Sequence, residues 1–279
     1  MGESFGARLR RVMDERGPLC AGIDPHPGLL REWDLPETAA GLERFALTAA
    51  EALGPVVAAV KPQSAFFERF GSAGIAVLER TVETARAGGA QVILDVKRGD
   101  IGSTAQAYAD AYLDQTSPLA CDAITASPFL GFGSLGPMIE TARANDAGVL
   151  VLALTSNPEG PEVQAARTGE LSVAGQMLAQ LTAANEGAAP MGSFGAVVGA
   201  TIAPPAEDLA INGPLLAPGV GAQGGDAATV RAIFAGVLHL VLPSVSRSLL
   251  RTGPDTGALA GAARRQADEM ATMVASGAG

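Results

Sequence analysis

The sequence has little of the chemistry that disulfide-bonded and metal-binding proteins depend on. Its 279 residues include two cysteines, two histidines and one tryptophan, and aromatic residues make up only 4%. Cys20 and Cys121 both fall in apolar runs, so we expect two buried thiols and neither a disulfide nor a metal pair. His239 is expected to pack inside a strand, whereas His26 lies between prolines and keeps an open role. With no carboxylates grouped at ligand spacing, the sequence predicts no metal site.

Basic charge and long apolar runs are scarce as well. Acidic residues outnumber basic ones by 29 to 19, which gives a net charge of -10 and a pI near 4.7. This balance argues against a nucleic-acid partner, which needs a basic face, but a few local cations can still attract a small anionic ligand. We see neither a signal peptide nor an apolar run that could span a bilayer. We therefore expect no membrane partner and a cytoplasmic location.

Short apolar runs that alternate with helical patterns are abundant. The runs with the length and composition of buried strands cover residues 18–23, 56–60, 91–97, 121–125, 149–154, 196–200, 215–219 and 238–242. Helical patterns cover residues 3–16, 37–53, 64–87, 103–114, 134–145, 170–186, 205–211, 227–235 and 255–275. The pattern over 64–87 predicts a helix with a break at Gly71 or Gly74.

This alternation predicts a single (β/α)₈ TIM barrel domain over residues 1–279. Strands that alternate with helices form βαβ units and a parallel sheet, and eight units suit a chain of this length. No linker or shift in composition divides the chain. The alternative is an open doubly wound sheet, which would need a Gly-rich turn after the first strand. Residues 22–27 (GIDPHP) are not such a turn.

The densest group of charges lies in residues 95–104, directly after the third apolar run. Side chains two residues apart share one face of a strand, so Asp95 and Lys97 should point the same way. Gly99 then ends the strand, and Asp100 falls on the turn or at the start of the next helix. One interpretation is a structural ion pair at the barrel end, with Asp100 as a helix N-cap. Because buried charges cost several kcal/mol unless they are paired, we favour a functional site.

Polar side chains also follow the other predicted strands. In a (β/α)₈ barrel the carboxyl ends of the strands meet at one mouth, where the active site lies. The residues at those ends are Asp24, Lys61, Asp95 with Lys97, Ser156, Gln223 and Arg247. Because each follows a different apolar run, the fold would bring all of them together.

The last two strand ends resemble an anion site. Residues 219–226 are Gly-rich and precede a helix, and Arg247 follows the eighth strand between two serines. Barrels often hold a phosphate with these two loops. Glycines let backbone N–H groups approach the anion, and an arginine binds it through two hydrogen bonds. The alternative is a plain turn and a surface arginine, but the pairing of the two features favours phosphate.

Taken together, these residues resemble the orotidine 5′-phosphate decarboxylase family, in its longer bacterial branch. The pattern Asp-x-Lys-x-x-Asp alone is shared with a wider barrel superfamily. Further matching segments, in the family's order, make the resemblance specific, and they cover residues 22–25, 61–68, 95–104, 218–226 and 246–248.

The resemblance implies decarboxylation of orotidine 5′-phosphate to UMP, the last step of de novo pyrimidine biosynthesis. It implies a homodimer with shared active sites and no metal or organic cofactor. By position, Lys97 would protonate C6 of the pyrimidine and Asp95 would face the departing carboxylate, while Asp24 and Lys61 would hold the ribose and complete the charged array. The remaining implied contacts are Ser156 on the pyrimidine edge, Pro218, Gln223 and Arg247 at the phosphate, and Asp100, Ile101 and Thr104 in the neighbouring subunit's site.

Three alternatives remain. The first is a 3-hexulose-6-phosphate synthase or a 3-keto-gulonate-phosphate decarboxylase, which resemble this barrel but need Mg²⁺ and an acid where this chain has Lys61. The second is a Schiff-base aldolase that uses Lys97, although neighbouring acids would keep that amine protonated and a poor nucleophile. The third is an inactive barrel that binds a phosphate ligand, against which the intact Asp95, Lys97 and Asp100 argue.

Overall fold

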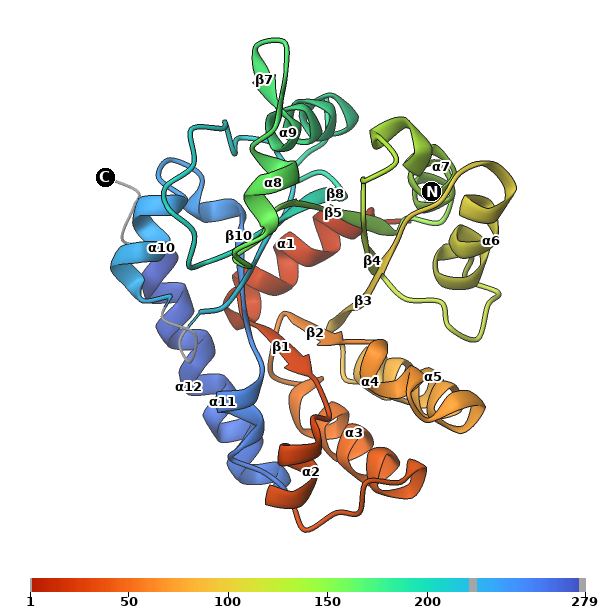
Figure 1. Cartoon of the computed structure of the whole chain (residues 1–279). Coiled ribbons are helices and arrows are strands. Elements are labelled where there is room, and N and C mark those ends of the chain that lie inside the picture. Colours follow the sequence, from red (N-terminus) through yellow and green to blue (C-terminus); the bar gives the residue numbers. More distant parts are fainter. Residues whose placement is uncertain (1, 221–224, 276–279) are drawn as a thin grey trace.

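A closed barrel of parallel strands forms the centre of the molecule (Figure 1). The computed structural model describes residues 2–220 and 225–275, and in these ranges eight strands close in the order β1-β10-β9-β8-β5-β4-β3-β2. The barrel strands are β1 (Cys20–Ile23), β2 (Ala59–Pro62), β3 (Gln91–Arg98), β4 (Ala123–Ala126), β5 (Gly148–Leu154), β8 (Phe194–Val198), β9 (Leu215–Pro218) and β10 (Val241–Val245). The predicted (β/α)₈ barrel is therefore confirmed.

Helices connect the strands, and most of them lie outside the barrel (Figure 1). The α-helices are α1 (Phe5–Arg16), α2 (Pro27–Glu32), α3 (Ala39–Leu53), α4 (Ala65–Glu68), α5 (Gly71–Ala87), α6 (Gly102–Leu113), α7 (Gly136–Ala144), α8 (Gly160–Gln164), α9 (Val173–Ala184), α10 (Ala227–Ile233), α11 (Arg247–Leu250) and α12 (Thr256–Ala275). Two 3₁₀ turns, η1 (Phe132–Leu135) and η2 (Leu238–Leu240), and a hairpin of β6 (Arg167–Thr168) and β7 (Leu171–Ser172) complete the fold. Among the helices described, none combines the length and apolar character needed to cross a bilayer.

Side chains at the helix starts explain several boundaries. The side chains of Ser4, Thr38, Ser172 and Asp226 each accept a backbone N–H from the first turn of α1, α3, α9 and α10. Such caps satisfy donors that have no partner within the helix. The predicted helix over 64–87 is divided into α4 and α5, and α5 begins at Gly71, whose φ is +63°. The break therefore lies at one of the two expected glycines.

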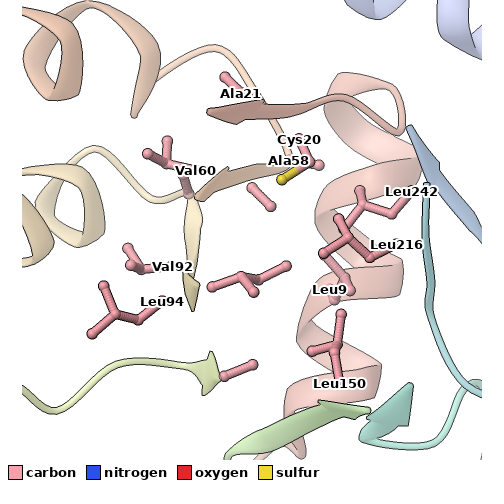
Figure 2. Packing of buried hydrophobic residues seen from close by; sticks show 14 of the residues in the cluster. Leu9, Cys20, Ala21, Ala58, Val60, Val92, Leu94, Leu150, Leu216 and Leu242 are labelled. Carbon is pink, nitrogen blue, oxygen red and sulfur yellow. The ribbon is translucent and has the colours of Figure 1, made fainter. Parts of the chain in front are cut away.

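The core is built from strand residues that are buried on both faces, as in other parallel sheets. Leu150, Leu216 and Leu242 belong to this cluster, together with Leu9 of α1 (Figure 2). The α1 helix therefore supplies apolar side chains to the barrel interior. Cys20 and Cys121 are both free and buried, as expected. Burial raises the pKa of each thiol to about 12, so both stay protonated near neutral pH.

Two strands begin three residues later than predicted. The second was expected at 56–60, but the N–H groups of Val56 and Val57 both bond to the carbonyl of Leu53, so the chain is still turning there. The eighth was expected at 238–242, but η2 occupies its first part. In both places the apolar run includes a turn whose apolar side chains are buried, which hydrophobicity does not distinguish from a strand.

Two further expectations are wrong. His239 does not pack inside a strand: it lies exposed on η2, where its carbonyl oxygen accepts a hydrogen bond from Arg10. Residues 205–211 form no helix. Pro204 and Pro205 lack N–H donors, and the Asp208 carboxylate accepts the N–H of Ala210, which replaces a helical bond with a local turn.

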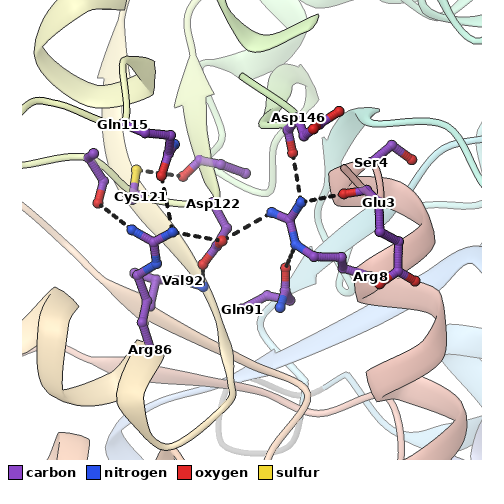
Figure 3. A network of polar contacts seen from close by, with 12 residues as sticks. Glu3, Ser4, Arg8, Arg86, Gln91, Val92, Gln115, Cys121, Asp122 and Asp146 are labelled. Atoms are coloured by element: carbon purple, nitrogen blue, oxygen red, sulfur yellow. Dashed lines mark hydrogen bonds and ion pairs between the residues drawn. The ribbon is translucent and has the colours of Figure 1, made fainter. Parts of the chain in front are cut away.

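A buried polar network closes the amino-terminal end of the barrel (Figure 3). Asp122, just before β4, is 5% exposed, and its carboxylate accepts hydrogen bonds from the Arg8 guanidinium at 3.1 Å and from the Val92 N–H at 2.8 Å. Arg86 of α5 lies 3.6 Å from the same carboxylate. Arg8 also bonds to Gln91 on β3. One carboxylate thus ties α1 and α5 to the barrel wall.

We expect Asp122→Ala to lower the free energy of unfolding by about 3 kcal/mol, because it leaves two cations and a buried N–H without their acceptor. Asp14→Ala is the matched control, since Asp14 also pairs with an arginine of α1 but has a side chain that is 65% exposed. Urea unfolding should show little change for the control. Equal losses in the two variants would contradict the role assigned to Asp122.

Candidate active site

A cavity of about 690 Å³ opens at the carboxyl ends of the barrel strands. Its lining draws on the ends of several strands, as the barrel fold requires. The predicted site residues that line it are Asp24, Lys61, Asp95, Lys97, Ser156, Pro218 and Arg247. The fold therefore brings together side chains that are up to 223 positions apart, counted from Asp24 to Arg247.

Asp95 lies at the centre of the charged part of this cavity. One of its carboxylate oxygens, Oδ2, accepts a hydrogen bond from Lys61 Nζ at 3.0 Å. The other, Oδ1, accepts hydrogen bonds from Lys97 Nζ at 2.6 Å and from the Thr125 hydroxyl at 2.8 Å. The Asp95 and Lys61 side chains are buried, whereas the Lys97 side chain is 46% exposed. Lys97 is therefore the cation of the pair that remains accessible from the cavity.

The charges in this array stabilise one another. Burial alone would raise the pKa of Asp95, but Lys61 and Lys97 outweigh it and hold that pKa well below its ordinary value. Burial alone would lower the pKa of Lys61, but Asp24 and Asp95 reverse the effect and raise it above its ordinary value. Near neutral pH, Asp95 is a carboxylate and Lys61 an ammonium group.

The backbone at the end of β3 is irregular where this array forms. The register with β4 shifts between Leu94 and Arg98, so the strand bulges over the residues that carry the charges. Lys97 has a φ of +46°, in the left-handed region that non-glycine residues seldom occupy. Its N–H donates to the Thr125 hydroxyl at 3.0 Å. Asp95 and Lys97 do meet, as expected, although the strand that carries them is not regularly pleated.

Thr125 is a site residue that the strand-end pattern did not identify. It lies in β4, is buried and lines the cavity, where its hydroxyl bridges the Lys97 backbone to the Asp95 carboxylate. A hydroxyl within the predicted strand 121–125 was visible in the sequence, but serine and threonine are too common to mark a site by themselves. His26 also lines the cavity, with its ring 4.2 Å from that of Phe66.

The loop that the sequence predicts to bind phosphate is described only in part. Pro218, Gly219 and Val220 line the cavity at the end of β9. Its neighbour β10 pairs with it through Ser244, and Arg247 begins α11 just after β10. Gly219 has a φ of +98°, a conformation that suits glycine. Gln223, the other predicted phosphate residue, lies outside the described residues.

A short network of side chains holds the loop that carries Ser156. The Gln164 side chain accepts the N–H of Thr155 at 2.9 Å and donates to its hydroxyl at 2.6 Å. The Thr155 hydroxyl in turn bonds to Asn157. The Ser156 side chain takes no part in this network and lines the cavity. The loop between β5 and α8 is therefore anchored on both sides of Ser156.

Three predicted residues lie outside this cavity lining. Ile101 is 62% exposed and Thr104 is also exposed, while Asp100 is partly buried and accepts the N–H of Ile101 at 2.8 Å. Asp100 is not the N-cap of α6, because Ile101 occupies that position. Within one chain, Asp100 therefore neither caps α6 nor lines the cavity.

Comparisons with known proteins show the family of the chain. Residues 17–261 match the model of the orotidine 5′-phosphate decarboxylase / HUMPS family. An orotidine 5′-phosphate decarboxylase from Nocardioides sp. is 66% identical over 88% of this chain and 92% of its own length. Another, from Streptomyces coelicolor, is 60% identical over 98% of this chain and 99% of its own. The chain belongs to the orotidine 5′-phosphate decarboxylase family.

Solved structures of the family share this fold. A crystal structure from Streptomyces avermitilis is 60% identical, with a TM-score of 0.95 over 98% of this chain and 97% of that one. The Leishmania donovani OMP decarboxylase is 31% identical, with a TM-score of 0.75 over 97% of this chain and 98% of that one. The family's barrel is therefore retained across the whole chain.

The lowered pKa of Asp95 gives a prediction for stability against pH. The stabilisation from this carboxylate is complete above its unfolded pKa of about 3.9 and is lost as the pH falls toward the folded pKa, at most about 1.4 kcal/mol per pH unit. The unfolding free energies of the wild type and Asp95→Asn should keep a constant difference above about pH 5 and shift against the wild type below about pH 4. Urea unfolding at stepped pH measures this. A difference that stays constant down to pH 3 would contradict it.

Proposed function

We propose that this chain, acting as one domain in the cytoplasm, decarboxylates orotidine 5′-phosphate to UMP with its own side chains. The observation that carries the proposal is the Lys61–Asp95–Lys97 array at the floor of a cavity that also presents Asp24 and Arg247. The substrate needs this combination, because it carries a carboxylate to be lost, a ribose and a phosphate. The family reaction supplies UMP for pyrimidine biosynthesis.

Lys97 is the proton donor in this proposal. Loss of CO₂ from C6 leaves negative charge on a carbon, and with no cofactor to accept it the protein must stabilise that charge. The Lys97 ammonium group is accessible, and its 2.6 Å hydrogen bond to Asp95 fixes its position. It attracts the developing carbanion and then protonates it at C6.

Asp95 acts on the ground state as well as on Lys97. Its carboxylate lines the cavity beside the position that the departing carboxylate would take, and the two negative charges would repel until CO₂ leaves. Its low pKa keeps it charged at neutral pH, so the repulsion is present throughout turnover. Asp24 and Lys61 complete the array and hold the ribose, and Ser156 contacts the pyrimidine edge.

Phosphate binding supplies energy from outside the reacting ring. Arg247, the backbone from Pro218 onward and Gln223 would hold the dianion. Binding energy from a non-reacting group can be used to orient the substrate and to close loops over it. In this arrangement Arg247, the cation that recognises the phosphate, lies away from C6.

The metal-dependent relatives are the nearest alternative. The matched family model covers the HUMPS enzymes as well, so membership alone does not separate the two reactions. Lys61 is the distinguishing residue, because its ammonium group occupies the end of β2 and pairs with Asp95 at 3.0 Å. A cation at that position repels Mg²⁺, which supports a metal-independent reaction.

We expect orotidine 5′-phosphate to lose its absorbance at the same rate with and without EDTA. The direct assay is absorbance decay with enzyme pretreated with the chelator, then repeated with added Mg²⁺. A sugar-phosphate substrate of the alternative enzymes serves as the control and should give no turnover. Loss of activity in EDTA with recovery in Mg²⁺ would replace this proposal by the metal-dependent one.

We propose further that the site is shared between the two subunits of a homodimer. Asp100, Ile101 and Thr104 lie outside the cavity of their own chain. Three large apolar side chains are exposed nearby: Ile101 at 62%, and Phe129 at 76% and Leu130 at 54% on the loop after β4. The two loops are in contact, since the Ser127 N–H donates to the Arg98 carbonyl at 2.8 Å. Their exposed apolar side chains form a surface that a second copy can cover, which would bring Asp100 to the partner's Lys97.

Mixing two inactive variants tests the shared site. Asp100→Ala and Lys97→Ala should each be nearly inactive alone. After dissociation and reassociation, half of the dimers are mixed and each has one intact site, so activity should recover toward about a quarter of wild type. Heterodimers are confirmed by native mass spectrometry. If they form without any recovery, Asp100 acts within its own subunit or has no catalytic role.

A further inference from the structure

Two buried oxygens in the cavity have no hydrogen-bond partner among the described residues. They are Oδ1 of Asp24, after β1, and the hydroxyl oxygen of Ser246, after β10. Both residues line the cavity. A buried polar atom without a partner costs free energy, so such atoms beside a binding cavity mark positions where a ligand supplies the missing bond.

Gly22 makes room for this pair. A Cβ on Gly22 would lie 2.7 Å from the Cβ and 3.0 Å from the hydroxyl oxygen of Ser246, and 3.1 Å from Oδ2 of Asp24. The missing side chain therefore lets Ser246 lie against β1 beside the Asp24 carboxylate. The Ser246 hydroxyl and the Asp24 carboxylate therefore lie at most about 6 Å apart, a separation that one small group hydrogen-bonded to both can bridge.

The chemistry of the two side chains defines that group. The Asp24 carboxylate only accepts hydrogen bonds, whereas the Ser246 hydroxyl can donate. A group that gives a proton to one and accepts from the other is a hydroxyl. A phosphate oxygen does not fit, because it has no proton for Asp24 and would be repelled by the carboxylate.

We propose that Ser246 is a further substrate-binding residue. Its hydroxyl donates a hydrogen bond to a ribose hydroxyl, and that ribose hydroxyl donates to the Asp24 carboxylate. This inference rests on the proposed function, since it takes a ribosyl phosphate as the ligand. It divides two adjacent residues between two parts of the substrate: Ser246 recognises the sugar and Arg247 the phosphate. The pair makes the enzyme selective for ribonucleotides over nucleotides that lack this hydroxyl.

The experiment measures the dissociation constants of UMP, 2′-deoxy-UMP, 3′-deoxy-UMP and uridine for the wild type, Ser246→Ala and Arg247→Ala. Ser246→Ala should weaken UMP and uridine binding by about five- to tenfold, the scale of an uncharged hydrogen bond. For one of the two deoxy analogues it should cause no further loss, because the partner hydroxyl is already missing. In turnover, KM should rise with kcat nearly unchanged.

Arg247→Ala is the matched contrast, and it should weaken UMP strongly while sparing uridine. The inference is overturned if Ser246→Ala binds UMP like the wild type, or if it loses the same factor for UMP and for both deoxy analogues. A loss confined to phosphorylated ligands would also overturn it, by assigning Ser246 to the phosphate. Measurements on the wild type separate this inference from the proposed function. If the wild type neither binds UMP nor turns over orotidine 5′-phosphate, the proposed function is refuted whatever the result for Ser246→Ala.

Discussion

The interaction on which the site depends is the shared carboxylate of Asp95. Its two oxygens take three donors, from Lys61, Lys97 and Thr125, in a place where water has largely been removed. A carboxylate in such a place costs several kcal/mol unless cations compensate, and each lysine needs the same carboxylate in return. The positions of the two ammonium groups are therefore fixed relative to each other. The buried Lys61 sets the charge of Asp95, and the accessible Lys97 is left to meet the substrate.

The barrel accommodates this array at a local conformational cost. The bulge in β3 and the left-handed backbone of Lys97 depart from regular strand geometry, and such strain persists only where the surroundings hold it. Thr125 provides that support from β4, since its one hydroxyl contacts both the backbone of Lys97 and the carboxylate of Asp95. At the opposite end of the barrel, the Asp122 network fixes α1 and α5 against β3 and β4. The Asp122 network at one end of the barrel and the strained backbone of Lys97 at the other thus involve the same two strands, β3 and β4.

The sequence shows the ionisable residues that follow apolar runs better than it shows the strand boundaries, and this decided how much of the site was visible. Ionisable residues directly after apolar runs, such as Asp24, Lys61 and Asp95, were found because parallel strands bring their carboxyl ends together. Strand starts at 56 and 238 were wrong because buried turns there are as apolar as strands. Thr125 and Ser246 carry no charge, and what distinguishes them is spatial: a hydroxyl between two groups, and a hydroxyl facing a missing Cβ at Gly22. The proposed shared site lies further out of reach, since one chain's sequence shows that Asp100 is acidic but not whether it enters a partner's cavity.

The net charge of -10 and an anionic substrate are reconciled by where the cations lie. Lys61, Lys97 and Arg247 all line the cavity, so the local potential there differs from that of the whole chain. Among the described residues of one chain, Lys97 forms an ion pair with Asp95 alone, and its side chain is 46% exposed. To keep its proton away from water until C6 accepts it, this lysine needs a second acidic neighbour and an apolar cover. Asp100 and Ile101 have the chemistry to supply them. In the proposed dimer each chain supplies that pair to the other, so association of the subunits completes the electrostatics of the site.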